Sequence, residues 1–309
     1  MRSVNRLAAL AALAALVGCG GSWSNSAIPP AGAADLGGVP GSSELQVWVP
    51  APPAAPACDT RPAATWLAAA GAASGMNQAT SAALAQYQRL RSEASTLADG
   101  LRVVGPVEDG AHADRERLLT LVRAGGAVPR FTLTAQARVK GTLQWTTVLT
   151  GVFDGASASG GTGTLTLDLD ALQALGMAEE GWGQGAVVIT YDRRTEAASV
   201  GVDVAQDTFG VLATAGGYGW TAAGTAGPGL LVHAQRDQDG GWRTVTSRFD
   251  GVGVGRDEVV YTPSGGASAS YAQCWDQAGC LTWVDDPADV SCEGAPCSLG
   301  SQGGCLALP

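Results

Sequence analysis

Strict alternation of apolar and polar residues dominates the stretch from 129 to 262. In the clearest run, residues 131–140, every apolar residue falls on one face and every polar residue on the other. A period of two is typical of a β-strand that has one face on a core and one in water. The alternation recurs, between turn-forming residues, at Leu143/Trp145/Leu149, Leu165/Leu167/Leu169, Val187/Ile189/Tyr191 and Val200/Val202/Val204, and more loosely around His233 and Val245. The pattern predicts a long antiparallel β-meander.

Helical spacing precedes this meander. Residues 62–101 are rich in alanine, with larger side chains three and four positions apart and a stop at Asp99-Gly100, which predicts a helix. A second helix is predicted at 114–124, with Leu118, Leu119 and Val122 on its apolar side. Within the meander, Asp170 and Gly176 fit the ends of a short helix at 171–175. The tail from 271 shows no periodicity of its own.

The first nineteen residues carry a separate signal. Arg2 and Arg6 precede an eleven-residue apolar run, Leu7 to Val17, which is too short to span a bilayer. The run ends in Leu16-Val17-Gly18-Cys19, which resembles the lipobox of bacterial lipoprotein precursors. The resemblance implies that residues 1–18 are a signal peptide and that Cys19 becomes the acylated N-terminus, a stable membrane anchor. Gly20 in place of Asp implies, by the same resemblance, sorting to the outer membrane.

The predicted organisation therefore has five parts. They are a signal peptide at 1–18, a Pro/Gly/Ser-rich tether at 19–57, a helical segment at 58–128, an antiparallel sheet at 129–262, and a cysteine-rich tail at 263–309 that closes on the same domain. Inside the tether, 45–49 is a candidate edge strand. The fold class is α+β: a large curved antiparallel sheet with N-terminal helices packed on one face. A half-barrel is one solution, and its element order is similar to that of the lipid-handling half-barrels of periplasmic lipoprotein carriers.

Charge narrows the choice of partners. The net charge is −10, and removing residues 1–18 takes away two arginines and no acid, which leaves −12. An acidic surface repels phosphate backbones, so nucleic acid is excluded as a partner.

Seven cysteines are present, and Cys19 is assigned to lipid. The remaining six, an even number in an exported chain, predict three disulfides, with fifteen possible connectivities. They are Cys58, Cys274, Cys280, Cys292, Cys297 and Cys305. Because no other predicted disulfide cysteine lies near Cys58 in the sequence, its bridge is predicted to join the start of the domain to the tail. The spacing of these cysteines and the lack of a histidine near them disfavour a zinc site, so no metal is predicted.

Catalytic candidates are sparse. The two histidines, His112 and His233, read as surface or edge residues, and no hydrolase or nucleotide-binding motif is present. Several aspartates fit turns, caps or solvent positions as well as they fit an acid pair or a calcium loop: Asp154, Asp168, Asp170, Asp237, Asp239 and Asp250. We therefore expect no catalytic residue, no cofactor and no enzymatic activity.

Three classes of function remain open. The favoured one is a membrane-anchored, non-enzymatic envelope lipoprotein, structural or partner-binding. The alternatives are a carrier of lipid or another hydrophobic ligand, and a hydrolase of the envelope. For the carrier question we expect a single concave apolar face lined by Phe131, Leu133, Trp145, Leu149, Leu165, Leu167, Val187, Ile189, Val200 and Val202. We expect Tyr87, Leu90, Leu97, Leu118 and Leu119 to fill it as plugs.

Overall fold

The fold was described from a computed structural model. It describes residues 40, 45–50, 58, 62–91, 95–98, 101–124, 127–155, 161–179, 182–194, 197–204, 216–223, 228–236, 240–250, 252–285, 298–299 and 305. All of these lie in the second of two compact units, Gly37–Pro309, the first being Met1–Leu36.

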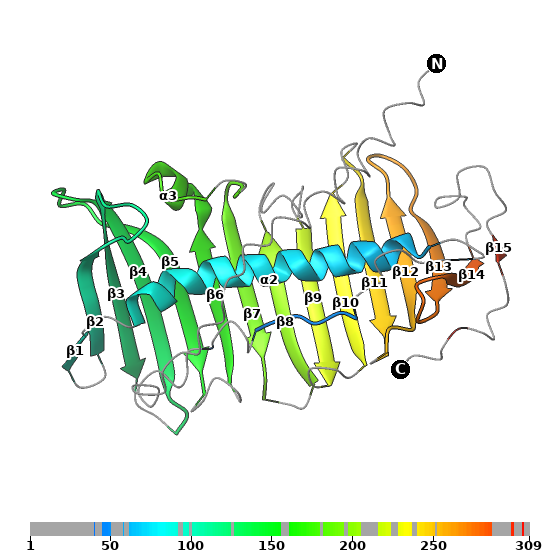
Figure 1. Cartoon of the computed structure of the whole chain (residues 1–309), viewed down its shortest axis with the longest axis horizontal. Coiled ribbons are helices and arrows are strands. Elements are labelled where there is room, and N and C mark those ends of the chain that lie inside the picture. Colours follow the sequence, from blue (N-terminus) through cyan, green and yellow to red (C-terminus); the bar gives the residue numbers. More distant parts are fainter. Residues whose placement is uncertain are drawn as a thin grey trace, which may run out of the picture. The chain divides into compact units, whose positions relative to one another are not determined.

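One sheet of fifteen strands forms the body of this unit, and each strand is antiparallel to its neighbours in chain order (Figure 1). The strands are β1 Ser95–Ala98, β2 Leu101–Glu108, β3 Arg115–Ala124, β4 Arg130–Val139, β5 Thr146–Asp154, β6 Thr162–Asp168, β7 Ala186–Asp192, β8 Ala197–Val204, β9 Gly216–Ala223, β10 Gly229–Arg236, β11 Trp242–Phe249, β12 Gly255–Thr262, β13 Ala269–Trp275, β14 Leu281–Asp285 and β15 Ser298–Leu299. The predicted class, α+β with a large antiparallel meander, is confirmed. The sheet is open, because β1 and β15 stand at opposite ends of the strand order.

The sheet begins earlier than the sequence pattern indicated. The prediction of a second helix at 114–124 is wrong, because these residues form β3, which pairs with β4 over its whole length. Arg117, Leu119 and Leu121 point to the buried face in a period of two. The adjacent leucines at 118 and 119 mimic a helical stripe, and a short apolar run cannot be assigned by period alone. The predicted helical segment 58–128 therefore contains one helix, α2, followed by the strands β1, β2 and β3.

The sheet also ends later than predicted. The tail from 271, predicted to be aperiodic, contributes to β13 and forms β14, and the register shifts between Cys274 and Trp275. That shift breaks the period of two, which explains why alternation was not visible in the sequence. The cysteine-rich tail is thus partly an extension of the sheet.

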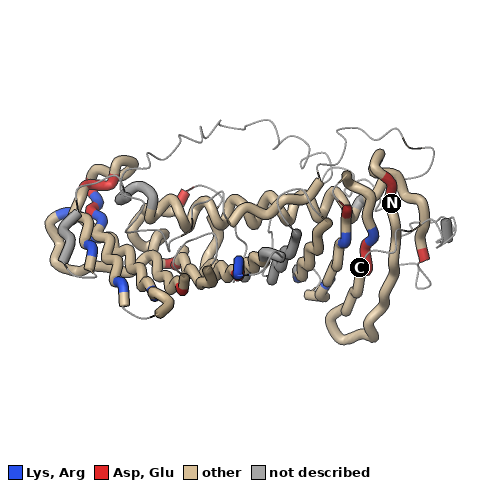
Figure 2. The backbone as a smooth tube through the Cα atoms, turned by 90° about the horizontal axis from the view of Figure 1, so that it is seen from below, with Lys and Arg blue, Asp and Glu red and all other residues tan. Residues whose placement is uncertain are grey.

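A single long helix, α2 (Ala64–Arg91), lies along one face of the sheet and crosses its strands (Figure 1). It contacts strands from β2 to β11. The predicted helix 62–101 is too long, because α2 ends at Arg91 and residues 95–98 form β1. No charged residue precedes Arg89, and in Figure 2 the tube of α2 is tan over almost its whole length. Its buried side is mostly small: Ala69, Ala72, Ala73, Ala79 and Ala83 are each at most 6% exposed. Small side chains let a helix axis come close to a sheet over many strands.

The face beneath α2, here called the inner face, is the apolar core. Of the ten residues predicted to line it, nine are buried there: Phe131, Leu133, Leu149, Leu165, Leu167, Val187, Ile189, Val200 and Val202. The tenth prediction is wrong, because Trp145 is half-buried and stacks against the guanidinium of Arg138, 4.3 Å from the ring centroid.

The predicted plugs are confirmed only in part. Tyr87 is 1% exposed on α2, as expected. Leu118 and Leu119 were misassigned, since both are strand residues of β3. The side chains of Leu90 and Leu97 lie outside the described residues.

Part of the predicted tether packs on the core. Leu45 and Val47 are buried, and the side-chain amide of Asn77 in α2 binds both backbone groups of Val47, at 2.7 Å to its nitrogen and 2.8 Å to its oxygen. Trp66 donates to the carbonyl of Pro50. Residues 45–49 are not an edge strand, because the Asn77 amide and not a neighbouring strand satisfies this backbone.

The short helix is close to its predicted place. It is α3 (Leu169–Ala174), and its N-cap is Asp168, whose carboxylate accepts from the backbone of Ala171. Asp170, predicted as the cap, instead accepts from the backbone of Gly185. Gly176 follows the helix at φ 66°, the left-handed conformation that favours glycine at a helix C-terminus.

Candidate functional site

A buried polar cluster fixes the first turn of α2 to the sheet. Thr65 of α2 donates to the carboxylate of Asp257 on β12 and accepts from the side-chain amide of Gln273 on β13. Ser247 on β11 stands directly opposite Asp257. All four side chains are at most 9% exposed. Asp257 Oδ1 and Ser247 Oγ have no hydrogen-bond partner among the described residues.

Burial controls the ionisation of this cluster. Removal from water raises the pKa of Asp257 to about 7, and the polar groups of Ser247, Thr65 and Gln273 offset only part of that rise. His233 on β10 lies on the same face at 2% exposure, so the expectation of a surface or edge histidine is wrong. Burial, followed by repulsion from Arg243, lowers the pKa of His233 to about 4. Both groups are therefore mainly uncharged near pH 6.

A second buried cluster fixes the C-terminal part of α2. Arg117 of β3 donates to the carboxylate of Asp109 and to the side-chain oxygen of Gln86 on α2. Asp109 also accepts from the backbone and ring of His112, at 2.9 and 3.0 Å. Burial raises the pKa of Asp109, but the charge and hydrogen bonds of Arg117, His112 and Ala111 outweigh it, so the net shift is downward. His112 is half-exposed, in keeping with its prediction as a surface residue.

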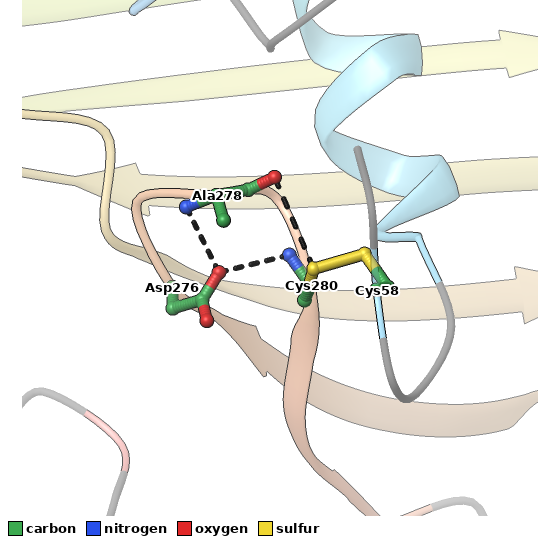
Figure 3. The surroundings of a disulfide bond; sticks show 4 residues. All are labelled: Cys58, Asp276, Ala278 and Cys280. Atoms are coloured by element: carbon green, nitrogen blue, oxygen red, sulfur yellow. Dashed lines mark hydrogen bonds between the residues drawn. A yellow bond between two sulfur atoms is a disulfide. The ribbon is translucent and has the colours of Figure 1, made fainter. Parts of the chain in front are cut away.

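Two disulfides lie at the β12–β14 end of the sheet. Cys58 bonds Cys280, a separation of 222 residues, and Cys274 bonds Cys305. Figure 3 shows Cys58 reaching Cys280 at the β13–β14 turn, where Asp276 accepts from the backbone of Ala278 and Cys280. The predicted bridge from the start of the domain to the tail is confirmed. Cys292, Cys297 and the predicted anchor Cys19 lie outside the described residues.

Four of the six candidate aspartates are described, and each is bound to backbone groups or to a neighbouring arginine. Asp168 and Asp170 bind backbone around α3, and Asp250 accepts from the backbone of Val252, Gly253 and Val254 in the β11–β12 turn. Asp154 lies 3.9 Å from Arg130. Asp237 and Asp239 lie outside the described residues. Within the part of the chain that is described, no group of three His, Cys, Asp or Glu side chains is placed to hold a metal ion.

The face opposite α2, here called the outer face, carries a distinct surface over β2–β7. Strand register aligns threonine and aliphatic residues in two rows across these six strands. We call these twelve residues the threonine–valine band. One row is Val103, Thr120, Thr134, Thr150, Thr166 and Val188, and the other is Leu101, Val122, Thr132, Val152, Thr164 and Thr190. All twelve are half-exposed or exposed, and none is charged.

Ion pairs border the band at both ends of the strands. One border holds Lys140 with Glu108 and Arg138 with Glu116, at 2.6 and 2.7 Å. The other holds Arg130 with Asp154 and Arg194 with Asp192, at 3.9 and 2.5 Å. A shallow, open depression of about 440 Å³ lies at this second border, lined in part by Arg130, Asp154 and Thr162. The band is thus an uncharged centre between two charge-balanced rims.

Comparison with known proteins adds no relative. No family model, no curated protein sequence and no solved structure matches the chain. Among the described residues, no helix is long and apolar enough to cross a membrane.

Sequence reasoning missed the two buried clusters and the band. Asp257 was detectable, because it alternates with Val259 and so falls on the apolar face of its strand. Arg117 was missed because residues 114–124 were predicted to be a helix, which gives the wrong buried face. The band was not detectable, because its rows form only once the strand registers are known.

Proposed function

We propose that the chain is a membrane-anchored, non-enzymatic envelope lipoprotein that binds a protein partner through the threonine–valine band. The lipobox at Leu16–Cys19 supports the anchor, and the two disulfides suit an oxidising compartment outside the cytoplasm. Gly20 favours the outer membrane as its location.

The exposed band is the observation that carries partner binding. Solvated sheet faces normally carry charged side chains, whereas twelve aligned positions here carry hydroxyls and methyls alone. A contiguous exposed surface of this kind, with charged rims, has the anatomy of an interaction site. In contact with a partner, its methyl groups can exclude water and its threonine hydroxyls can form hydrogen bonds.

The carrier alternative receives less support. A carrier would bind its ligand on the inner face, where α2 already covers the apolar side chains. Displacing α2 would expose that apolar area at about 25 cal/mol per Å² and would break both polar clusters. An organic extract of the purified protein should therefore contain no stoichiometric lipid beyond that bound covalently at Cys19. Stoichiometric free lipid, lost when Tyr87 is replaced by Glu, would favour the carrier.

The anchor is tested by mass spectrometry of protein extracted from membranes. We expect an acylated peptide that begins at Cys19, and a Cys19→Ser variant that is not acylated. A soluble product cleaved elsewhere would contradict the anchor.

Partner binding is tested by a photo-crosslinking side chain placed in living cells at Thr150, in the centre of the band. Val260, which is 43% exposed on the outer face of β12, is the matched control position. We expect a discrete adduct from Thr150 and none from Val260. If neither position gives an adduct, the proposed function is wrong.

A further inference from the structure

We infer that the partner is a second copy of this chain, and that two copies pack face to face through their threonine–valine bands. The inference rests on the proposed function, which makes the band a binding surface. A second copy is favoured by four properties of that surface: its balanced charge, the charged positions that limit it on the same sheet, its size, and its shape and chemistry.

Charge balance favours self-association through this face. The chain as a whole carries −10, so two copies repel in a random orientation. The rims of the band, however, hold four cations in four ion pairs with four anions. Two such faces approach without net repulsion, and the uncharged centres meet without burying an unpaired charge.

The outer face of β11 and β12 differs. On β11 and β12 the corresponding positions hold Arg248 and Arg256, which share Glu258 at 3.4 and 3.2 Å. Across β7–β8, register places Asp203 opposite Val188, so the first row of the band ends there. Packing these charged positions against a copy would bury like charges, which limits the interface to the band.

The band and its rims have the size of a stable interface. Neighbouring strands lie about 4.8 Å apart, so six strands span roughly 24 Å, and the eight steps from Arg130 to Arg138 span roughly 27 Å. The product is roughly 650 Å² for each copy and roughly 1,300 Å² for the pair, within the range of specific protein interfaces.

A second copy of the chain also matches the band in shape and chemistry. Two twisted sheets pack about 10 Å apart when their twists agree, and identical sheets agree by construction. A two-fold axis between the faces brings the centre of one band against the centre of the other. There the threonine methyls and the valines exclude water, while threonine hydroxyls bond to one another. Anchoring both copies in one membrane raises their effective concentration.

The test uses the full lipidated chain, purified in detergent, and measures its mass by sedimentation. Thr150 is exposed, so Thr150→Arg and Thr150→Glu should leave the monomer folded, with circular dichroism and melting temperature close to those of the wild type. We expect the wild type to be a dimer and each variant alone to be a monomer, with affinity reduced more than about 100-fold by like charges at the centre.

Two further samples make the result specific. An equal mixture of Thr150→Arg and Thr150→Glu should recover the dimer, because opposite charges then meet. The control Thr246→Arg, on the outer face of β11 and directly opposite Glu258, should remain dimeric. A dimer that is insensitive to Thr150→Arg, or one equally broken by Thr246→Arg, would overturn the inference.

The outcomes also separate this inference from the proposed function. A monomeric wild type that still gives an adduct with another protein from Thr150 in cells overturns the second copy and leaves partner binding intact. A monomeric wild type with no adduct from Thr150 overturns both.

Discussion

Asp257 and His233 lie on the inner face with pKa values shifted in opposite directions. The pKa of Asp257 rises from 3.8 to about 7, so the folded protein holds this proton more tightly than the unfolded chain. Its contribution to the free energy of unfolding therefore falls as the pH rises from about 4 to about 7. The pKa of His233 falls from 6.5 to about 4, so its contribution falls as the pH drops through that range. Between about pH 4 and about pH 6.5 the two slopes oppose each other.

Replacing Asp257 with Asn should remove one of these slopes. Relative to the wild type, the free energy of unfolding of Asp257→Asn should rise by on the order of 4 kcal/mol between about pH 4 and about pH 7. Unlike the wild type, the variant should lose stability on acidification below about pH 6.5, because the effect of protonating His233 on the free energy of unfolding is no longer opposed by Asp257. Urea unfolding across this pH range measures both effects. A difference between variant and wild type that does not change with pH would contradict the assignment.

Arg117 should be the costlier of two arginines to remove. Arg117→Met leaves the carboxylate of Asp109 buried without its cation, so we expect a loss of about 3–5 kcal/mol and a higher pKa for Asp109. The control is Arg130→Met, whose ion pair with Asp154 is largely exposed and should contribute about 0–1 kcal/mol. Equal losses from the two variants, measured by urea unfolding, would show that the buried pair does not hold α2.

At the scale of elements, the position of α2 on the sheet depends on contacts at its two ends. Its alanine side chains allow α2 to lie close to the sheet, but they are too small to fix its position along the sheet. The Thr65–Asp257–Gln273 and Gln86–Arg117–Asp109 clusters supply that position at the two ends. At the first turn, Trp66 also stacks on Trp275 of β13, with ring centroids 5.9 Å apart. Gly255 makes room for this stack, since a Cβ there would lie 2.2 Å from the Trp275 ring.

The Cys58–Cys280 disulfide should protect the start of α2. It closes 222 residues, for which the chain-entropy model gives about 5 kcal/mol, against about 4 kcal/mol for Cys274–Cys305. In the double variant Cys58→Ser/Cys280→Ser, amides in the first turns of α2 should exchange with solvent faster than in the wild type. The corresponding Cys274→Ser/Cys305→Ser variant should leave exchange in those turns unchanged. Equal effects on α2 would contradict a local role for the first bridge.

At the scale of the whole molecule, the remaining cysteines give a chemical test. With two bridges placed and Cys19 assigned to lipid, Cys292 and Cys297 are predicted to form the third disulfide. Thiol titration of the unfolded, unreduced protein should find essentially no free thiol, and one after Cys297→Ser. Two free thiols in the wild type would count against a third bridge.

Local pattern determined much of this protein. The alternation at 131–140, 165–169 and 187–191 located β4, β6 and β7 and identified their buried face, because a side-chain period of two is a property of a strand by itself. The parity of the cysteines and the isolation of Cys58 were enough to predict its long bridge. Asp170 and Gly176 located α3 to within two residues, since helix ends are set by neighbours in sequence.

Tertiary structure decided the rest. Residues 115–124 are a strand because β2 and β4 pair with them on both sides, and the adjacent leucines alone allow a helix. His233 is buried because α2 and the sheet enclose its face, which no local pattern reports. The threonine–valine band exists only through register: its twelve residues come from six strands, and a slip of one residue in any strand would turn that strand's side chains to the other face. The position of a residue across the strands is set by pairing between distant segments. The band therefore cannot be predicted from the local sequence pattern.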